Sequence, residues 1–136
     1  MGRTLFLASA AHLRGETLLE ELGLRRHEEE IDGRRYTAVL LELPNACLLF
    51  ISEGKLALGT LALAVPSQLR ERPGITSVGV LGERHTLLAR VLAERLAGLK
   101  GKIALVSLRA HGPETQVGPR ALAMLKKVLE EAGREP

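Results

Sequence analysis

The residues that could carry out covalent or metal chemistry are few in this sequence. Cys47 is the only cysteine, and it lies in the middle of an apolar run. Burial among leucines raises the pKa of a thiol and blocks access to it, so we expect a small buried residue rather than a nucleophile. The histidines are His12, His27, His85 and His111. None is spaced from another histidine, the cysteine or Asp32 as metal ligands are, so we expect polar surface or partly buried contacts and no metal.

Other catalytic patterns give no stronger signal. A Ser–His–acid triad forms in space, so spacing along the chain does not test it, but no nucleophile-elbow pattern is present. We therefore predict a protein that is not an enzyme and that carries no cofactor.

Two glycine pairs resemble part of a phosphate loop. Gly54-Lys55 and Gly59-Thr60 lack the Walker spacing, and no helix is predicted after Lys55, so a turn followed by a bulge fits them better. Arg70 and Arg72 lie in a loop bracketed by prolines, where an acidic partner, a phosphate or plain solvent fits equally well. A small-molecule or nucleotide-binding module of unknown ligand is thus an open alternative.

The composition is that of a single domain over residues 1–136, with 46% apolar and 26% charged residues. The charges are mostly arginine and glutamate and amide side chains are rare, which favours a thermophilic source. The net charge is only +3 and basic residues alternate with acidic ones, so we expect no nucleic-acid partner. No apolar run reaches the roughly 20 residues of a membrane helix. With one cysteine and no signal-peptide core, the pattern predicts a cytoplasmic protein without a membrane partner.

The chain is organised around residues 46–65. Two apolar runs, 46–51 and 56–65, flank a turn that contains Gly54, which predicts a central β-hairpin. The alternation of apolar residues changes phase at Gly59, which predicts a bulge there. Asp32-Gly33 predicts a first hairpin whose leading strand, 25–31, is an exposed edge protected by glutamates. Together these segments predict a four-stranded antiparallel meander.

The later segments predict two strands and two helices. Strands are expected at 75–81 and 102–109, and helices at 82–99 and 119–132. The first of these helices carries a leucine stripe: Leu88, Leu92, Leu96 and Leu99. Weaker patterns suggest an edge strand at 4–7 and a helix at 15–22.

The predicted fold class is α+β: an antiparallel β-sheet of about six strands with two long amphipathic helices packed on it. The central strands are apolar on nearly every residue, so both faces of the sheet need a cover. If the helices cover one face, a second copy of the protein is the simplest cover for the other.

Several short signatures occur in a specific order. They are Gly33, Gly54-Lys55, Gly59-Thr60-Leu61, Pro66-Ser67, Leu81-Gly82, the apolar strand 103–108, Ala121-Leu122 and Leu125-Lys126. Their order and spacing resemble the third type of proteasome-assembling chaperone, as an archaeal-like homologue. The resemblance covers residues 25–133, and residues 1–24 look like an N-terminal addition to that core.

This resemblance implies a non-enzymatic assembly chaperone for 20S proteasome α-subunits, acting as a homodimer. The C-terminal residues 134–136 lack the hydrophobic–Tyr–any-residue tail with which other proteasome chaperones dock. Docking is therefore expected through the body of the domain, at the loop formed by Gln68, Leu69, Arg70, Glu71 and Arg72.

Overall fold

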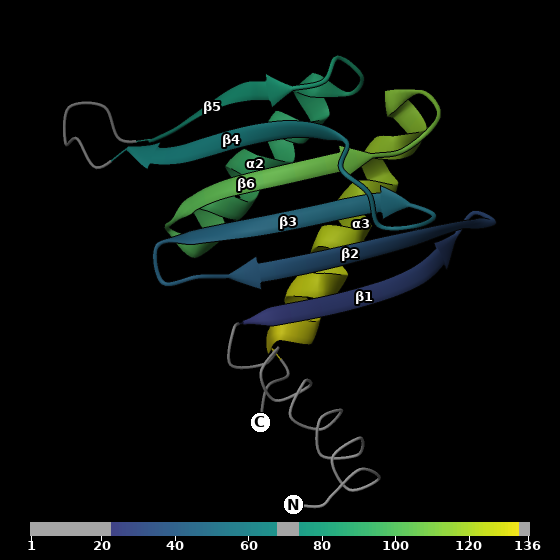
Figure 1. Cartoon of the computed structure of the whole chain (residues 1–136), viewed down its shortest axis with the longest axis horizontal. Coiled ribbons are helices and arrows are strands. Elements are labelled where there is room, and N and C mark those ends of the chain that lie inside the picture. The colour runs from purple at the N-terminus through teal and green to yellow at the C-terminus, as the bar shows by residue number, and fades with distance from the viewer. Residues whose placement is uncertain (1–22, 68–73, 134–136) are drawn as a thin grey trace, which may run out of the picture.

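The computed structural model describes residues 23–67 and 74–133. The predicted strand at 4–7, the predicted helix at 15–22 and the loop from Gln68 to Arg72 lie outside these ranges. Six strands and two helices follow one another along the described chain, as Figure 1 shows. In chain order they are β1 (Leu24–Ile31), β2 (Arg34–Glu42), β3 (Ala46–Glu53), β4 (Thr60–Ser67), β5 (Gly74–Leu81), α2 (Thr86–Lys100), β6 (Ile103–Arg109) and α3 (Glu114–Gly133).

The α+β class is confirmed, but the sheet is mixed rather than antiparallel. The strand order is β1-β2-β3-β6-β4-β5, and β3 runs parallel to β6 while the other neighbours are antiparallel. Helix α2 carries the chain from the β5 edge back to the centre, so β6 enters the sheet between β3 and β4. A crossover of this kind gives no local sequence signal, because its partners are distant along the chain.

The predicted central hairpin and the four-stranded meander are therefore wrong. Strands β3 and β4 do not pair, because β6 lies between them. Residues 54–59 form a loop that crosses the end of β6, and β4 begins only at Thr60. A Cβ atom on Gly59 would lie 2.2 Å from the Leu108 carbonyl oxygen, so only glycine permits this close crossing. Since residues 56–58 are not in a strand, the change of phase requires no bulge at Gly59.

The first hairpin is confirmed. Ile31 pairs with Arg34, and Asp32 and Gly33 between them have φ angles of 52° and 77°. Two positive φ angles are those of a type I′ turn, which matches the right-handed twist of the strands. Strand β1 is an edge of the sheet, as the glutamates of this strand predicted.

Helix α2 is confirmed, but it begins at Thr86, and its buried face includes only part of the predicted leucine stripe. Its buried residues are Ala89, Leu92, Ala93, Leu96 and Ala97. Leu99, in the predicted stripe, is 62% exposed. Leu92 and Leu96 of the predicted stripe are fully buried, and alanines beside them complete the buried face because small side chains let a helix pack close to the strands.

Helix α3 begins at Glu114, earlier than the predicted start at Pro119, which lies inside the helix. The Pro113 carbonyl accepts hydrogen bonds from the backbone N–H groups of Gln116 and Val117, and these close the first turn. The buried face of this helix consists of Val117, Ala121, Met124, Leu125 and Val128.

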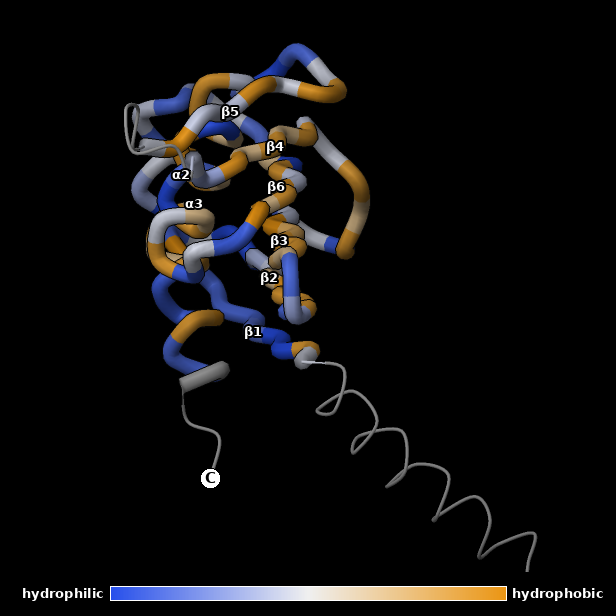
Figure 2. The backbone as a smooth tube through the Cα atoms, turned by 90° about the vertical axis from the view of Figure 1, so that its left-hand side faces the viewer, coloured by the Kyte–Doolittle hydropathy of each residue, from blue (hydrophilic) through white to orange (hydrophobic). Residues whose placement is uncertain are grey.

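The molecule has two layers. Both helices pack on one face of the sheet, and the opposite face has no helix over it within the described residues, as the edge view in Figure 2 shows. The core lies between these layers and contains the inward side chains of the central strands, such as Leu40, Leu49 and Val106.

Candidate functional site

The sheet face that points away from the helices is apolar, and we call it the outer face. Strand residues alternate between the two faces, so each buried core position is followed by an outward one. On β2 to β6 most outward positions are occupied by aliphatic or aromatic side chains, and the polar exceptions include Thr37, Ser52, Thr76 and Ser107. The apolar outward residues are Val39, Leu41, Leu48, Phe50, Leu61, Leu63, Val65, Val78, Val80, Ile103 and Leu105.

Strand register aligns these side chains into continuous rows. Leu41 pairs with Leu48, Leu48 pairs with Leu105, Leu105 pairs with Leu63, and Leu63 pairs with Val78. One apolar row thus crosses five strands without a polar interruption. Val78 at the end of this row is 54% exposed. Contiguous apolar patches of this kind mark interaction surfaces in soluble proteins, because a solvated sheet face normally alternates to polar residues.

The loop between β3 and β4 extends this apolar surface. Figure 2 shows it bulging from the side of the sheet opposite to the helices. It exposes Leu56 and Leu58 to solvent. The Ser52 hydroxyl holds both the N–H and the carbonyl of Ala57 at 3.0 Å, and the Gly59 N–H donates to Ser107 Oγ at 2.9 Å. These bonds hold the loop against the sheet and fix where its leucines lie.

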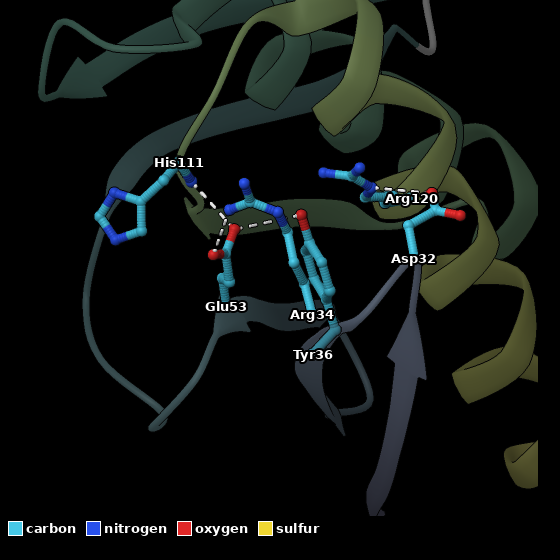
Figure 3. A network of polar contacts seen from close by, with 6 residues as sticks. All are labelled: Asp32, Arg34, Tyr36, Glu53, His111 and Arg120. Carbon is cyan, nitrogen blue, oxygen red and sulfur yellow. Dashed lines mark hydrogen bonds and ion pairs between the residues drawn. The ribbon is translucent and has the colours of Figure 1, made fainter.

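A polar network closes one end of the sheet beside this loop (Figure 3). The Glu53 carboxylate accepts a hydrogen bond from Arg34 at 2.9 Å and from the backbone N–H of His111 at 3.1 Å. The Tyr36 hydroxyl lies 3.5 Å from the same carboxylate. Glu53 therefore joins β2, β3 and the segment that leads into α3.

The charge of Glu53 is stabilised by these contacts. Burial raises the pKa of Glu53, but the His111 N–H and the Arg34 guanidinium outweigh burial and hold that pKa below its ordinary value. Beside this network, Arg120 of α3 pairs with Asp32 in the β1–β2 turn at 3.1 Å. The role of the network is structural: it holds the ends of four segments together.

A second apolar surface lies on the helical side. A groove of about 540 Å³ runs between α2 and α3, and Arg95 and Lys126 contribute to its lining. Its apolar lining consists of Leu99, Pro119, Leu122, Ala123, Leu125 and Leu129. The groove was not predicted, because it depends on how α2 and α3 pack beside each other, which leaves Leu99 exposed.

The cysteine and the histidines that could act as nucleophiles or metal ligands do not form a common site among the described residues. Cys47 is fully buried, and burial, followed by the nearby Glu42, raises the pKa of its thiol. His27 lies 2.8 Å from Glu29, and the His111 side chain is exposed. In the described part of the chain, no three His, Cys, Asp or Glu residues are close enough to hold a metal ion. His12 lies outside the described residues.

His85 differs from the expected surface or partly buried position, because it is buried. Gly54 has a φ of 82° and donates its N–H to the Arg35 carbonyl of β2, and residues 54–55 form a bend that leads into the crossing loop instead of the predicted hairpin turn. The predicted partner-binding residues, Gln68 to Arg72, lie outside the described residues and stay a prediction. Strands β4 and β5 end and begin on either side of them.

Sequence comparison identifies no relative: no family model and no curated protein matches this chain. Structural comparison finds a similar fold. A chain in the crystal structure of a chaperone complex for yeast 20S proteasome assembly has a similar fold, with a TM-score of 0.55 and 14% sequence identity. The match covers 79% of this chain and 93% of that chain.

The fold is therefore that of a proteasome-assembly-chaperone-like domain, of the mixed α+β class described above. The matched chain comes from a chaperone complex. Within the residues that the structure describes, no helix is long and apolar enough to cross a membrane.

Proposed function

We propose that this protein is a non-enzymatic, cytoplasmic assembly chaperone for 20S proteasome α-subunits, and an archaeal-like homologue of the third type of proteasome-assembling chaperone. It acts through protein–protein contacts, as a homodimer. The observation that carries the proposal is the outer face, an apolar surface across the sheet that no described helix covers and that the crossing loop covers only at one end. The similarity in fold to a chain of a yeast proteasome-assembly chaperone complex supports the choice of partner.

The outer face suits a second copy of the same chain. A two-fold axis brings the same surface of both subunits together, and an apolar face without strong charge is complementary to itself. Leu48, Leu63 and Leu105 lie at the centre of the face and would be most deeply buried there. The crossing loop with Leu56 and Leu58 would add to the rim of this contact.

The α-subunit would then meet a part of the molecule outside the dimer contact. The segment Gln68–Arg72 follows β4 and precedes β5 in the sequence, and Arg70 and Arg72 give it a positive charge. We predict that it docks onto an acidic α-subunit surface. Rim charges of this kind act mainly on the association rate and weaken with salt.

Solution mass, measured by light scattering after size exclusion, tests the dimer. The wild-type protein should have twice the mass of one chain. Val78→Glu places a charge on the outer face, at a position exposed enough to leave the fold intact, and should give a monomer. Val91→Glu is the matched control, because Val91 is 41% exposed but lies on α2, on the helical side. A wild-type monomer, or a dimer that only Val91→Glu disrupts, would contradict the proposed interface.

Mixing with α-subunits from the same organism tests the partner. The dimer should co-elute with an α-subunit, and Arg70→Glu/Arg72→Glu should abolish co-elution while the dimer persists. Lys126→Glu/Lys127→Glu on α3 makes the same change in charge and should have no effect. A dimer that ignores every α-subunit would remove the chaperone proposal and leave the dimer standing.

The absence of covalent chemistry is tested at Cys47. A buried thiol with a raised pKa reacts slowly, because only the thiolate is nucleophilic and access requires opening of the core. Native protein should be labelled by a thiol reagent far more slowly than urea-unfolded protein. Fast labelling of the native protein would argue for a reactive cysteine instead.

A further inference from the structure

A second concave site lies at the end of the sheet, where α2 begins. It is a pocket of about 340 Å³, within the range of pockets that hold small molecules. The crossing loop, the end of β6 and the residues before α2 form its wall. Its lining residues are Gly59, Thr60, Arg84, His85, Leu108, Arg109, Ala110 and His111.

One buried polar group in this wall has no partner. His85 is only 8% exposed, and neither its Nδ1 nor its Nε2 has a hydrogen-bond partner among the described residues. A neutral imidazole carries one N–H donor and one acceptor nitrogen, and buried polar groups are almost always satisfied. An unpaired ring that lines a pocket therefore indicates a ligand that the ring contacts.

The charge around the pocket defines the sign of that ligand. Arg84 and Arg109 are both exposed at the pocket, and no carboxylate pairs with either among the described residues. None of the lining residues is acidic. Glu53, whose carboxylate accepts the N–H of the lining residue His111, is also engaged by Arg34. Two free guanidinium groups beside a buried imidazole favour an anion.

Helix α2 adds to this preference. No side chain caps its first turn, and no acidic residue lies there. The first N–H groups of a helix have no acceptor within the helix and attract anions. The Thr60 hydroxyl donates to the Arg84 carbonyl, which fixes the residues before the helix against β4.

We propose that this pocket binds the phosphate group of a small molecule. Arg84 and Arg109 would pair with the phosphate oxygens, and His85 would donate a ring N–H to one of them. The fork of a guanidinium matches phosphate geometry, and two such groups match the charge of a dianion. None of the pocket's lining residues belongs to the apolar rows of the outer face or to the segment Gln68–Arg72, and the site goes beyond the proposed chaperone function.

Histidine-selective NMR on the full-length protein tests the proposal with sodium phosphate as the probe. Phosphate should shift the His85 ring signals in a saturable way, while sodium chloride at equal ionic strength should not. The His27 signals, at the opposite side of the molecule, should stay in place. A His85 ring that does not respond, or that responds equally to chloride, would overturn the proposal.

Variants show whether phosphate binding depends on the arginines of the pocket or only on the net charge of the protein. Arg84→Gln/Arg109→Gln should weaken phosphate binding at least about tenfold, because it removes both charged partners. Lys126→Gln/Lys127→Gln removes the same charge from the exposed face of α3 and should bind as the wild type does. Equal affinity of the arginine variant and the wild type would overturn the site. His85→Asn keeps a residue that tolerates the left-handed backbone of this position and should also bind more weakly.

A comparison of adenosine monophosphate with inorganic phosphate shows whether the pocket binds a phosphate ester or the free phosphate ion. If adenosine monophosphate binds more tightly than inorganic phosphate and shifts the same His85 signals, a phosphate ester is the natural occupant. If both bind equally, the free ion is sufficient. Either result requires that the arginine variant loses the binding.

Discussion

The two faces of the sheet are built from nearly the same residue types, yet only one of them is covered. On the helical side, Leu40, Leu49 and Val106 are fully buried under α2 and α3. On the outer face, their neighbours Leu41, Leu48 and Leu105 keep part of their surface accessible. Hydrophobicity of the strands therefore does not decide burial; the position of the helices does.

This difference indicates what the two faces are for. The inner face gains its stability within the chain, because each apolar side chain there is removed from water on folding. On the outer face, apolar side chains stay in contact with water, so their burial against another surface would lower the free energy further. A sheet with helices on one face and an apolar surface on the other fits the proposed role in protein–protein association.

The largest effect is expected from truncation on the inner face. Leu49→Ala should lower the free energy of unfolding by about 3 kcal/mol, because it leaves a cavity among buried residues. Leu48→Ala, the next residue on the outer face, should cost at least about 1 kcal/mol less in the monomer. Urea unfolding followed by circular dichroism, with both changes made in Val78→Glu protein to keep it monomeric, gives the comparison. Equal losses would show that the faces do not differ.

Gly59→Ala tests the loop that crosses onto the outer face. The added Cβ would lie 2.2 Å from the Leu108 carbonyl oxygen and 2.6 Å from Arg109 Cβ, so the loop must move. We expect a loss of about 2 kcal/mol in thermal or urea unfolding. Gly101→Ala is the control, because it has a φ of 65° but open space around it, and should cost about 1 kcal/mol. If Gly59→Ala left the free energy of unfolding unchanged, the close approach of this loop to the end of β6 would be contradicted.

Glu53→Gln tests the polar network that joins β2, β3 and the segment before α3 at one end of the sheet. It should lower stability at neutral pH by about 1–2 kcal/mol, because Arg34 and the His111 N–H lose a charged acceptor. The pKa of Glu53 is lowered in the folded state, so its contribution is present above the unfolded pKa and is lost as pH falls through the folded pKa.

The gap between wild type and Glu53→Gln should therefore shrink as the pH is lowered below about 4. Urea unfolding at a series of pH values measures this gap. Glu130→Gln, an exposed position on α3, should differ little from wild type at any pH. A gap that stays constant into acid would mean that the carboxylate charge is not what stabilises this end.

The smallest effect is expected from a polar substitution on the outer face. Val78→Thr exchanges a methyl group for a hydroxyl at a position that is 54% exposed and should change monomer stability by less than about 0.5 kcal/mol. Val106→Thr makes the same exchange at a fully buried position and should cost about 1–3 kcal/mol. Calorimetry at low protein concentration compares them. A large loss for Val78→Thr would mean that the outer face is covered within the chain.

Local chemistry predicted that six strands and two helices exist, although β4 begins later and α3 begins earlier than predicted. Asp32-Gly33 specified a turn because these residues tolerate positive φ, and the periods of apolar residues identified the strands and helices. The buried state of Cys47 and the apolar character of both sheet faces followed in the same way. Each of these properties depends on residues that are close together in the sequence.

The tertiary structure alone decided how these elements combine. Strand β6 entered between β3 and β4, since its pairing depends on α2 returning the chain to the centre of the sheet. The side of α2 that faces the strands combines Leu92 and Leu96 with three alanines, and the exposure of Leu99 was decided by this packing. The pocket around His85 collects residues from 59 to 111, and no local pattern specifies such a gathering, because it is stabilised only by contacts between distant segments.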